Sequence, residues 1–267
     1  MGKMISRSVA VAFLLVASGA CSSDRLVVPN MNNPTQDDLA RDPIAGLQLA
    51  ATGILRQNRL TYDGLISDVG IFGRESYDYF PTDGRSYSHY VMQNPLDRAG
   101  FSSGGWATRY VNRRNVFNFL NAVENSTLLT AAQKEGARGF AKTMDALELH
   151  YIVNQRFNYG AVIDIKENPR ELAPFVSRDS VLNYVIALLE QAKVHLASPG
   201  AAFPFQLHAG YTGFTTPATF LRFNRALTAR GEVWRASLRV AACGANGTTC
   251  YQRALTALNE SFLDRTA

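Results

Sequence analysis

Aromatic side chains gather in one segment of this 267-residue sequence, between residues 74 and 110. The segment holds eight of them in 37 residues, about twice the density of the whole chain, which is 10% aromatic. Flat rings pack well on the C–H faces of sugars, and tyrosine hydroxyls can bond sugar hydroxyls. Gly, Pro, Asp and Ser recur between Gly73 and Gly105 without a helical period, which predicts a long irregular loop of the kind that often carries function.

Five residues of this segment are our candidate ligand contacts: Arg74, Tyr77, Tyr79, Tyr87 and Trp106. For each ring the alternative is that it anchors the loop onto neighbouring helices, because aromatic side chains often serve packing. That alternative is stronger for Trp106 and Tyr110, which lie four residues apart at an expected helix start. For Arg74 the alternative to ligand binding is an ion pair that orders the loop around Glu75.

Carboxylates in the same segment raise the question of glycosidase chemistry, with Glu75, Asp78 and Asp83 as candidate members of an acid pair. Carboxylates are common in polar loops, so this pattern is unspecific. The four histidines are dispersed, and the sequence lacks a metalloprotease spacing, a phosphate-binding glycine loop and a nucleophile elbow. We therefore predict a protein that is not an enzyme, with no catalytic residues, no metal site and no cofactor.

A basic group, Arg109, Arg113 and Arg114, follows the aromatic segment on an expected helix. It is weakly suggestive of phosphate or lipopolysaccharide binding. A solvated helix face is the favoured interpretation, and we expect no nucleic-acid partner because the chain carries an export signal.

The first 20 residues have the three parts of a secretory signal peptide. Lys3 and Arg7 give a positive start, residues 9–17 form an apolar run, and Ser18 begins a stretch of small residues. The cysteine that follows, Cys21, makes the segment similar to a bacterial lipoprotein signal, in which this thiol is acylated. Ser18 departs from that pattern, where an aliphatic residue is usual, so an ordinary signal peptide is the alternative.

We expect cleavage before Cys21 and a lipidated tether over residues 21–43. Ser22 and Ser23 follow the cysteine, with no aspartate to signal inner-membrane retention, which favours the outer membrane. Several acyl chains anchor a protein firmly, whereas one gives only marginal binding. Loss of Lys3 and Arg7 lowers the formal charge from +5 to +3, so the basic balance no longer argues for an acidic partner.

Two further cysteines, Cys243 and Cys250, enclose a short polar loop between helical patterns. Because an exported chain meets oxidising conditions, a structural disulfide between them is the favoured interpretation. The alternative is a metal site, but no histidine or second cysteine pair lies nearby in sequence to complete four ligands.

The rest of the chain has helical periodicity and predicts a mainly α, all-α domain over residues 44–267. Helices are expected over residues 44–59, 62–72, 106–123, from Thr130 to about 152, from Ser177 to about 196, from Thr216 to about 238, and from Tyr251 to the end. Start signals include Asp42–Pro43, Thr130 with Gln133, and Thr216–Pro217. Their lengths, and the small residues beside aromatics, resemble degenerate tetratricopeptide-like pairs with long loops.

Several segments together resemble the SusD/RagB family of outer-membrane nutrient-uptake lipoproteins, the starch-utilisation type. They are residues 26–30, 33–35, 70–77, 138–147, 177–192, 223–230 and 251–263, and they follow the family order across the chain. The resemblance implies a non-catalytic cell-surface lipoprotein that binds oligosaccharides, or less often other nutrients. It also implies a TonB-dependent, SusC-like transporter as the partner that receives them.

Members of that family are usually about twice as long, so we expect this chain to correspond to an N-terminal half without the C-terminal, ligand-side half, either as a truncated reading frame or as a reduced member. A second hypothesis is a helical-repeat lipoprotein that serves as a scaffold for outer-membrane protein assembly, without a small ligand. A third, a secreted hydrolase, requires turnover that depends on Glu75 or Asp78.

Overall fold

The computed structural model describes residues 43–60, 62–77, 84, 88 and 105–263. The described chain is all-α apart from one short ribbon, which confirms the predicted fold class. The helices are α3 (Pro43–Arg59), α4 (Tyr62–Phe72), α6 (Trp106–Asn125), α7 (Ala131–Arg156), α8 (Arg178–Leu196), α9 (Pro217–Ser237) and α10 (Thr248–Asn259). Short 3-10 turns cover η3 (Phe157–Tyr159), η4 (Ala209–Tyr211), η5 (Ala241–Cys243) and η6 (Ala245–Gly247).

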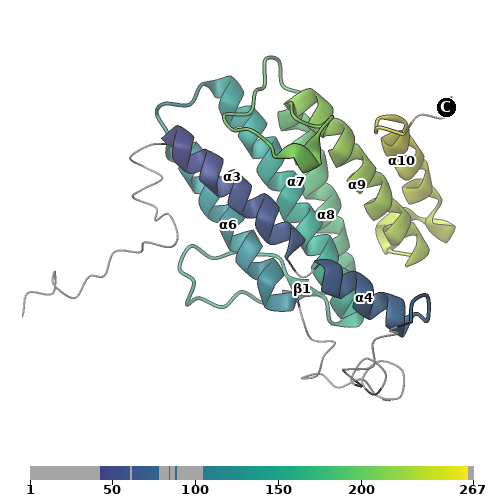
Figure 1. The fold of residues 1–267 in the computed structure, drawn as a ribbon. Helices are drawn as coiled ribbons and strands as arrows, with labels where there is room; N and C mark the ends of the chain where they lie inside the picture. The colour runs from purple at the N-terminus through teal and green to yellow at the C-terminus, as the bar shows by residue number, and fades with distance from the viewer. Residues whose placement is uncertain (1–42, 61, 78–83, 85–87, 89–104, 264–267) are drawn as a thin grey trace, which may run out of the picture.

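The long helices form a row in which each one packs on the next, in the order α3, α6, α7, α8, α9, α10, and α7 also touches α9 (Figure 1). Helix α4 follows α3 and contacts it, and Figure 1 shows it below the long helices. Packing of successive helices on one another is the arrangement that short connections favour. That these pairs are tetratricopeptide-like remains a prediction.

Local sequence sets the helix starts. The Thr130 side chain accepts a hydrogen bond from the Gln133 N–H, and the Gln133 side chain accepts one from the Thr130 N–H, which is a complete capping box. Thr216 and Thr219 make the same reciprocal pair at the start of α9, where Pro217 occupies the first turn. Ser177 caps α8 by a single bond, in which its side chain accepts from the Ser180 N–H.

The core has two parts along the row. One is built on α3, α6, α7 and α9 and includes a group of phenylalanine rings, and the other lies mainly between α7, α8 and the end of α9. The segment between α8 and α9, expected as a loop, folds Phe203 and Phe205 into the first part against Phe140. The Gln48 side chain on α3 holds that segment by two hydrogen bonds to the Gln206 backbone, donating to its carbonyl and accepting from its N–H.

The only strands among the described residues are β1 (Ala161–Val162) and β2 (Phe175–Val176), which pair antiparallel. The sequence predicted only a loop here. In the described part of the chain, no helix has both the length and the hydropathy to cross a membrane.

Candidate functional site

A partly exposed aromatic platform lies where α6 and β2 begin. The rings of Trp106 and Phe175 are nearly parallel, with centroids 6.1 Å apart and an interplanar angle of 4°. Tyr110 packs on the tryptophan at 4.8 Å, and the Arg156 guanidinium lies 4.7 Å from the Trp106 ring centre. Phe175 is 61% exposed, whereas Trp106 and Tyr110 are half-buried, so Phe175 is the ring of this group that is open to solvent.

Two more rings extend from the end of α7. Phe157 and Tyr159 both belong to the 3-10 turn η3, and Tyr159 is 73% exposed. Arg178, the first residue of α8, places its guanidinium 5.0 Å from the Phe157 ring centre. Phe157 has a φ of 35°, which non-glycine residues rarely adopt, so the turn is held in a strained form. We call Trp106, Phe157, Tyr159 and Phe175, with Arg156 and Arg178, the aromatic end.

The ribbon that carries Phe175 is fixed to α6 by polar contacts. The Tyr110 hydroxyl donates to the Val162 carbonyl at 3.1 Å and accepts from the Val162 N–H at 2.8 Å. Arg113 donates to the carbonyls of Val162 and Ile163 at 2.8 and 2.7 Å. Burial raises the pKa of Tyr110, so this hydroxyl stays protonated and can serve as the donor. The support of the aromatic end is therefore pre-organised.

The prediction that Arg109, Arg113 and Arg114 form a solvated face of α6 is wrong for two of these three residues. Arg109 and Arg113 are 0% and 1% exposed, while Arg114 is half-buried with its guanidinium over the Phe117 ring. Arg113 pairs with Asp145 of α7 at 2.7 Å. Buried guanidinium groups need such partners, because removing a charge from water is costly.

Beneath α3, α6 and α7 lies a fully buried polar cluster around Glu148. Its carboxylate accepts hydrogen bonds from Asn58 and Asn112, each at 2.7 Å, and from Arg109 at 3.3 Å. Arg109 also donates to the Asn58 carbonyl at 2.7 Å. Burial raises the pKa of Glu148, against the lowering effect of these partners. The cluster ties three helices together and offers no access to a ligand.

A small cavity of about 240 Å³ opens beside the Arg113–Asp145 pair. Its lining residues come from α6, α7, α8 and the chain after β1: Arg113, Val116, Phe117, Leu120, Lys142, Asp145, Ile163, Asp164, Ile165, Tyr184 and Leu188. Ligand pockets usually measure ~300 Å³ or more, so this one is small. Arg113 and Lys142 already have partners, Lys142 donating to Gln191 at 2.8 Å. We therefore favour the aromatic end as the candidate site.

An apolar groove of about 530 Å³ runs between α9 and α10. Its lining is almost wholly apolar, with Arg230 as the charged member: Ala226, Ala229, Arg230, Val233, Trp234, Tyr251, Ala254, Leu255, Leu258 and Leu263. The groove lies on the last helix pair of the row.

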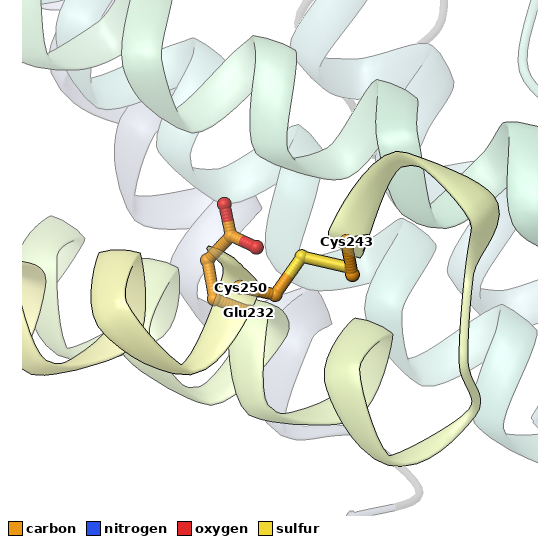
Figure 2. A group of neighbouring side chains, drawn as sticks. All are labelled: Glu232, Cys243 and Cys250. Atoms are coloured by element: carbon orange, nitrogen blue, oxygen red, sulfur yellow. A yellow bond between two sulfur atoms is a disulfide. The ribbon is translucent and has the colours of Figure 1, made fainter. Parts of the chain in front are cut away.

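Cys243 and Cys250 form a disulfide with a Cα–Cα distance of 4.9 Å, which confirms the predicted pairing (Figure 2). The Glu232 carboxylate lies beside it, and the three residues together have the composition of a metal site (Figure 2). The two sulfurs are bonded to each other, and the carboxylate accepts from Arg235 and Arg253 at 2.8 and 2.9 Å. Two guanidinium groups repel a cation, so this cluster is structural.

The structure places only part of the predicted ligand set. Trp106 belongs to the aromatic end. Tyr77 is 65% exposed, and Arg74, just past α4, has a φ of 61° and forms no ion pair with any described residue. Tyr79, Tyr87 and the lipidation residue Cys21 lie outside the described residues, as do Asp78 and Asp83.

Three rings of the aromatic end were not predicted: Phe157, Tyr159 and Phe175. Their sequence signal was weak, because they lie in a stretch that we expected to be a loop. The signal that could have found them is the presence of three aromatic residues at the two ends of the loop that follows α7.

No protein-family model, no curated protein and no solved structure matches this chain. The resemblance to the SusD/RagB family therefore rests on the sequence segments described above.

Proposed function

We propose that this protein is a non-catalytic lipoprotein of the outer-membrane surface that binds oligosaccharides or related nutrients. In this proposal it passes them to a TonB-dependent transporter. The observation that carries the proposal is the aromatic end, in which exposed rings stand on a rigid helical support. The lipoprotein-like signal before Cys21 supports the location.

The aromatic end suits a sugar for physical reasons. Phe175 stacks on the Trp106 ring and is 61% exposed, so its outer side gives an apolar face for axial C–H groups. Arg156 lies over the Trp106 ring and Arg178 lies over the Phe157 ring, where it also pairs with Asp179, so both bring N–H donors for sugar hydroxyls to the aromatic end.

Affinity electrophoresis of the full chain through gels that contain different polysaccharides tests the proposal. We expect retardation by at least one glycan, and its loss in Trp106→Ala and Phe175→Ala. Tyr251→Ala removes an exposed ring from α10 and is the matched control. No retardation by any glycan contradicts a glycan-binding function.

Lipidation and location have their own test. Radiolabelled palmitate added to growing cells should label the protein, and Cys21→Ser should abolish the label. An unlabelled protein secreted into the medium contradicts the anchor.

The scaffold hypothesis stays the second candidate, favoured by the apolar groove between α9 and α10. Affinity purification from solubilised outer membranes separates the two functions. A TonB-dependent barrel among the bound proteins supports the first, and an outer-membrane assembly complex supports the second.

A further inference from the structure

The apolar groove between α9 and α10 is formed by two matching helix faces. Residues 226–234 of α9 and residues 251–258 of α10 line it at spacings of mostly three or four, so each helix turns one face toward the same hollow. Ala229 and Ala254 are buried at its floor, and Leu255 is exposed at its rim. Small side chains between larger ones leave a volume of about 530 Å³, which lies in the usual range for small-molecule sites.

Ion pairs and the disulfide fix the two walls of the groove relative to each other. Glu232 of α9 pairs with Arg253 of α10 at 2.9 Å, and Arg225 of α9 pairs with Glu260, just past α10, at 2.6 Å. Lys193 of α8 reaches the same Glu260 carboxylate at 2.9 Å. The Cys243–Cys250 bond ties the start of α10 to the chain that leaves α9. The groove is therefore preformed, which lowers the entropic cost of filling it.

A single cation borders this apolar hollow. Arg230 is the one charged residue among the described residues that line the groove. It is exposed, and its side chain forms no ion pair or hydrogen bond with any described residue. Its guanidinium carbon lies 5.9 Å from the centre of the Tyr151 ring, which places it on the side of α9 that meets α7. An apolar hollow with one available guanidinium matches a ligand that has an apolar tail and one anionic head.

The size of the groove favours a small ligand over a protein. Ten residues line it, whereas a stable protein–protein interface takes about 20 to 30 residues from each partner. The lining residues of α9 extend over about 12 Å of helix axis, from Ala226 to Trp234. An elongated molecule with a short hydrocarbon chain fits these dimensions, and a partner helix or a second copy of the chain would need a larger surface.

We propose that the groove between α9 and α10 binds a fatty acid of medium chain length. The acyl chain lies on the apolar lining, and the carboxylate pairs with Arg230. This site is separate from the aromatic end and does not depend on glycan binding there.

Calorimetric titration of the full chain with decanoate tests the proposal, in a Cys21→Ser background that keeps attached acyl chains out of the experiment. We expect decanoate to bind, and hexanoate and octanoate to bind more weakly, by up to about tenfold for each two carbons removed. The neutral probe 1-decanol should bind more weakly than decanoate. Added salt should reduce the affinity for decanoate and leave that for 1-decanol unchanged.

Two pairs of variants locate the binding. Arg230→Gln should weaken decanoate by about threefold to tenfold without affecting 1-decanol, whereas Arg222→Gln, an exposed arginine of α9 outside the groove lining, should change neither. Ala226→Trp fills the hollow and should abolish binding of both probes. Val194→Trp adds the same ring at an exposed position of α8 and should leave binding intact. Circular dichroism of each variant checks that the fold is kept.

Several outcomes would overturn the proposal. One is an equal affinity for decanoate and 1-decanol that Arg230→Gln leaves unchanged, and another is no binding of any of these probes. A dimer in sedimentation that Ala226→Trp converts to a monomer would show that a second copy occupies the groove instead. Phe175→Ala should not change the affinity for decanoate, so failure of this site and failure of the glycan site are distinguishable.

Discussion

Arg109 and Glu148 form an ion pair at 3.3 Å in which neither side chain exposes any surface. The pair joins α6 to α7, and Asn58 brings α3 into the same cluster. A buried ion pair is weak evidence for stability, because desolvation offsets the attraction between the charges. Breaking it by removing one partner is costly, because it leaves a charge without compensation.

We expect Arg109→Met to lower the free energy of unfolding by about 3 to 5 kcal/mol, because Glu148 then lacks its cation. The double variant Arg109→Met/Glu148→Gln should lose less, since no buried charge remains. Chemical denaturation of the wild type, both single variants and the double variant measures the difference. A double variant that is less stable than Arg109→Met contradicts this account.

His150 predicts a pH dependence of stability. It is 2% exposed, its Nε2 atom has no partner in the described chain, and burial lowers its pKa to about 3, with a smaller contribution from Arg230. The unfolded histidine has a pKa of about 6.5, so between these values only the unfolded state binds the proton. Stability is therefore present above about pH 6.5 and is lost as the pH falls toward 3.

The control is His150→Phe, which keeps an aromatic ring against Trp234. We expect the wild type to lose about 2 to 3 kcal/mol more than this variant between pH 7 and pH 4.5. Urea unfolding at both pH values measures it. Parallel losses in the two proteins contradict the buried neutral histidine.

The disulfide should stabilise the end of the row. Closing the short loop between Cys243 and Cys250 is worth about 2 to 3 kcal/mol in the chain-entropy model. We expect a reducing agent to lower the Tm of the wild type. The Cys243→Ser/Cys250→Ser protein should have a lower Tm than the wild type, and the reducing agent should not change it. A change of Tm in that variant would show that the reducing agent acts elsewhere.

Gly160 tests the link between the ribbon and the aromatic end. Its φ is +64°, and an added Cβ would lie 1.9 Å from the Val176 carbonyl oxygen. Gly160→Ala should therefore destabilise the protein and weaken glycan retardation by displacing β2. Gly200→Ala, at a φ of +71° with nothing within 4 Å, should cost only the ~1 to 2 kcal/mol of left-handed backbone and leave binding intact.

Local signals gave much of the fold. The helix over Tyr62–Phe72 and the capping box at Thr130 lie where the sequence predicted them, because caps and periodicity act over a few residues. The predicted face of α6 was wrong at Arg109 because residue type alone places arginine in water. Its partner Glu148 lies 39 positions away, on another helix, and periodicity does not report such pairing.

The aromatic end shows the same limit. Trp106 was predicted as a ligand contact from the aromatic-rich segment. Phe175 reaches Trp106 only because the two short strands β1 and β2 pair and reverse the chain after α7. Strands this short carry no alternation that a sequence could show. The side chains that complete a site from distant segments therefore needed the structure.

The central claim, that the aromatic end binds glycan, is tested most directly by calorimetric titration of Phe175→Ala beside the wild type and Tyr251→Ala. The titrant is the glycan that retards the wild type most in electrophoresis. Phe175 exposes 61% of its side chain and Tyr251 exposes 42%, so the two substitutions remove comparable exposed rings. The account predicts an affinity loss of about tenfold in Phe175→Ala alone, since a stacked ring contributes about 1 kcal/mol or more. Equal affinity in all three proteins would contradict it.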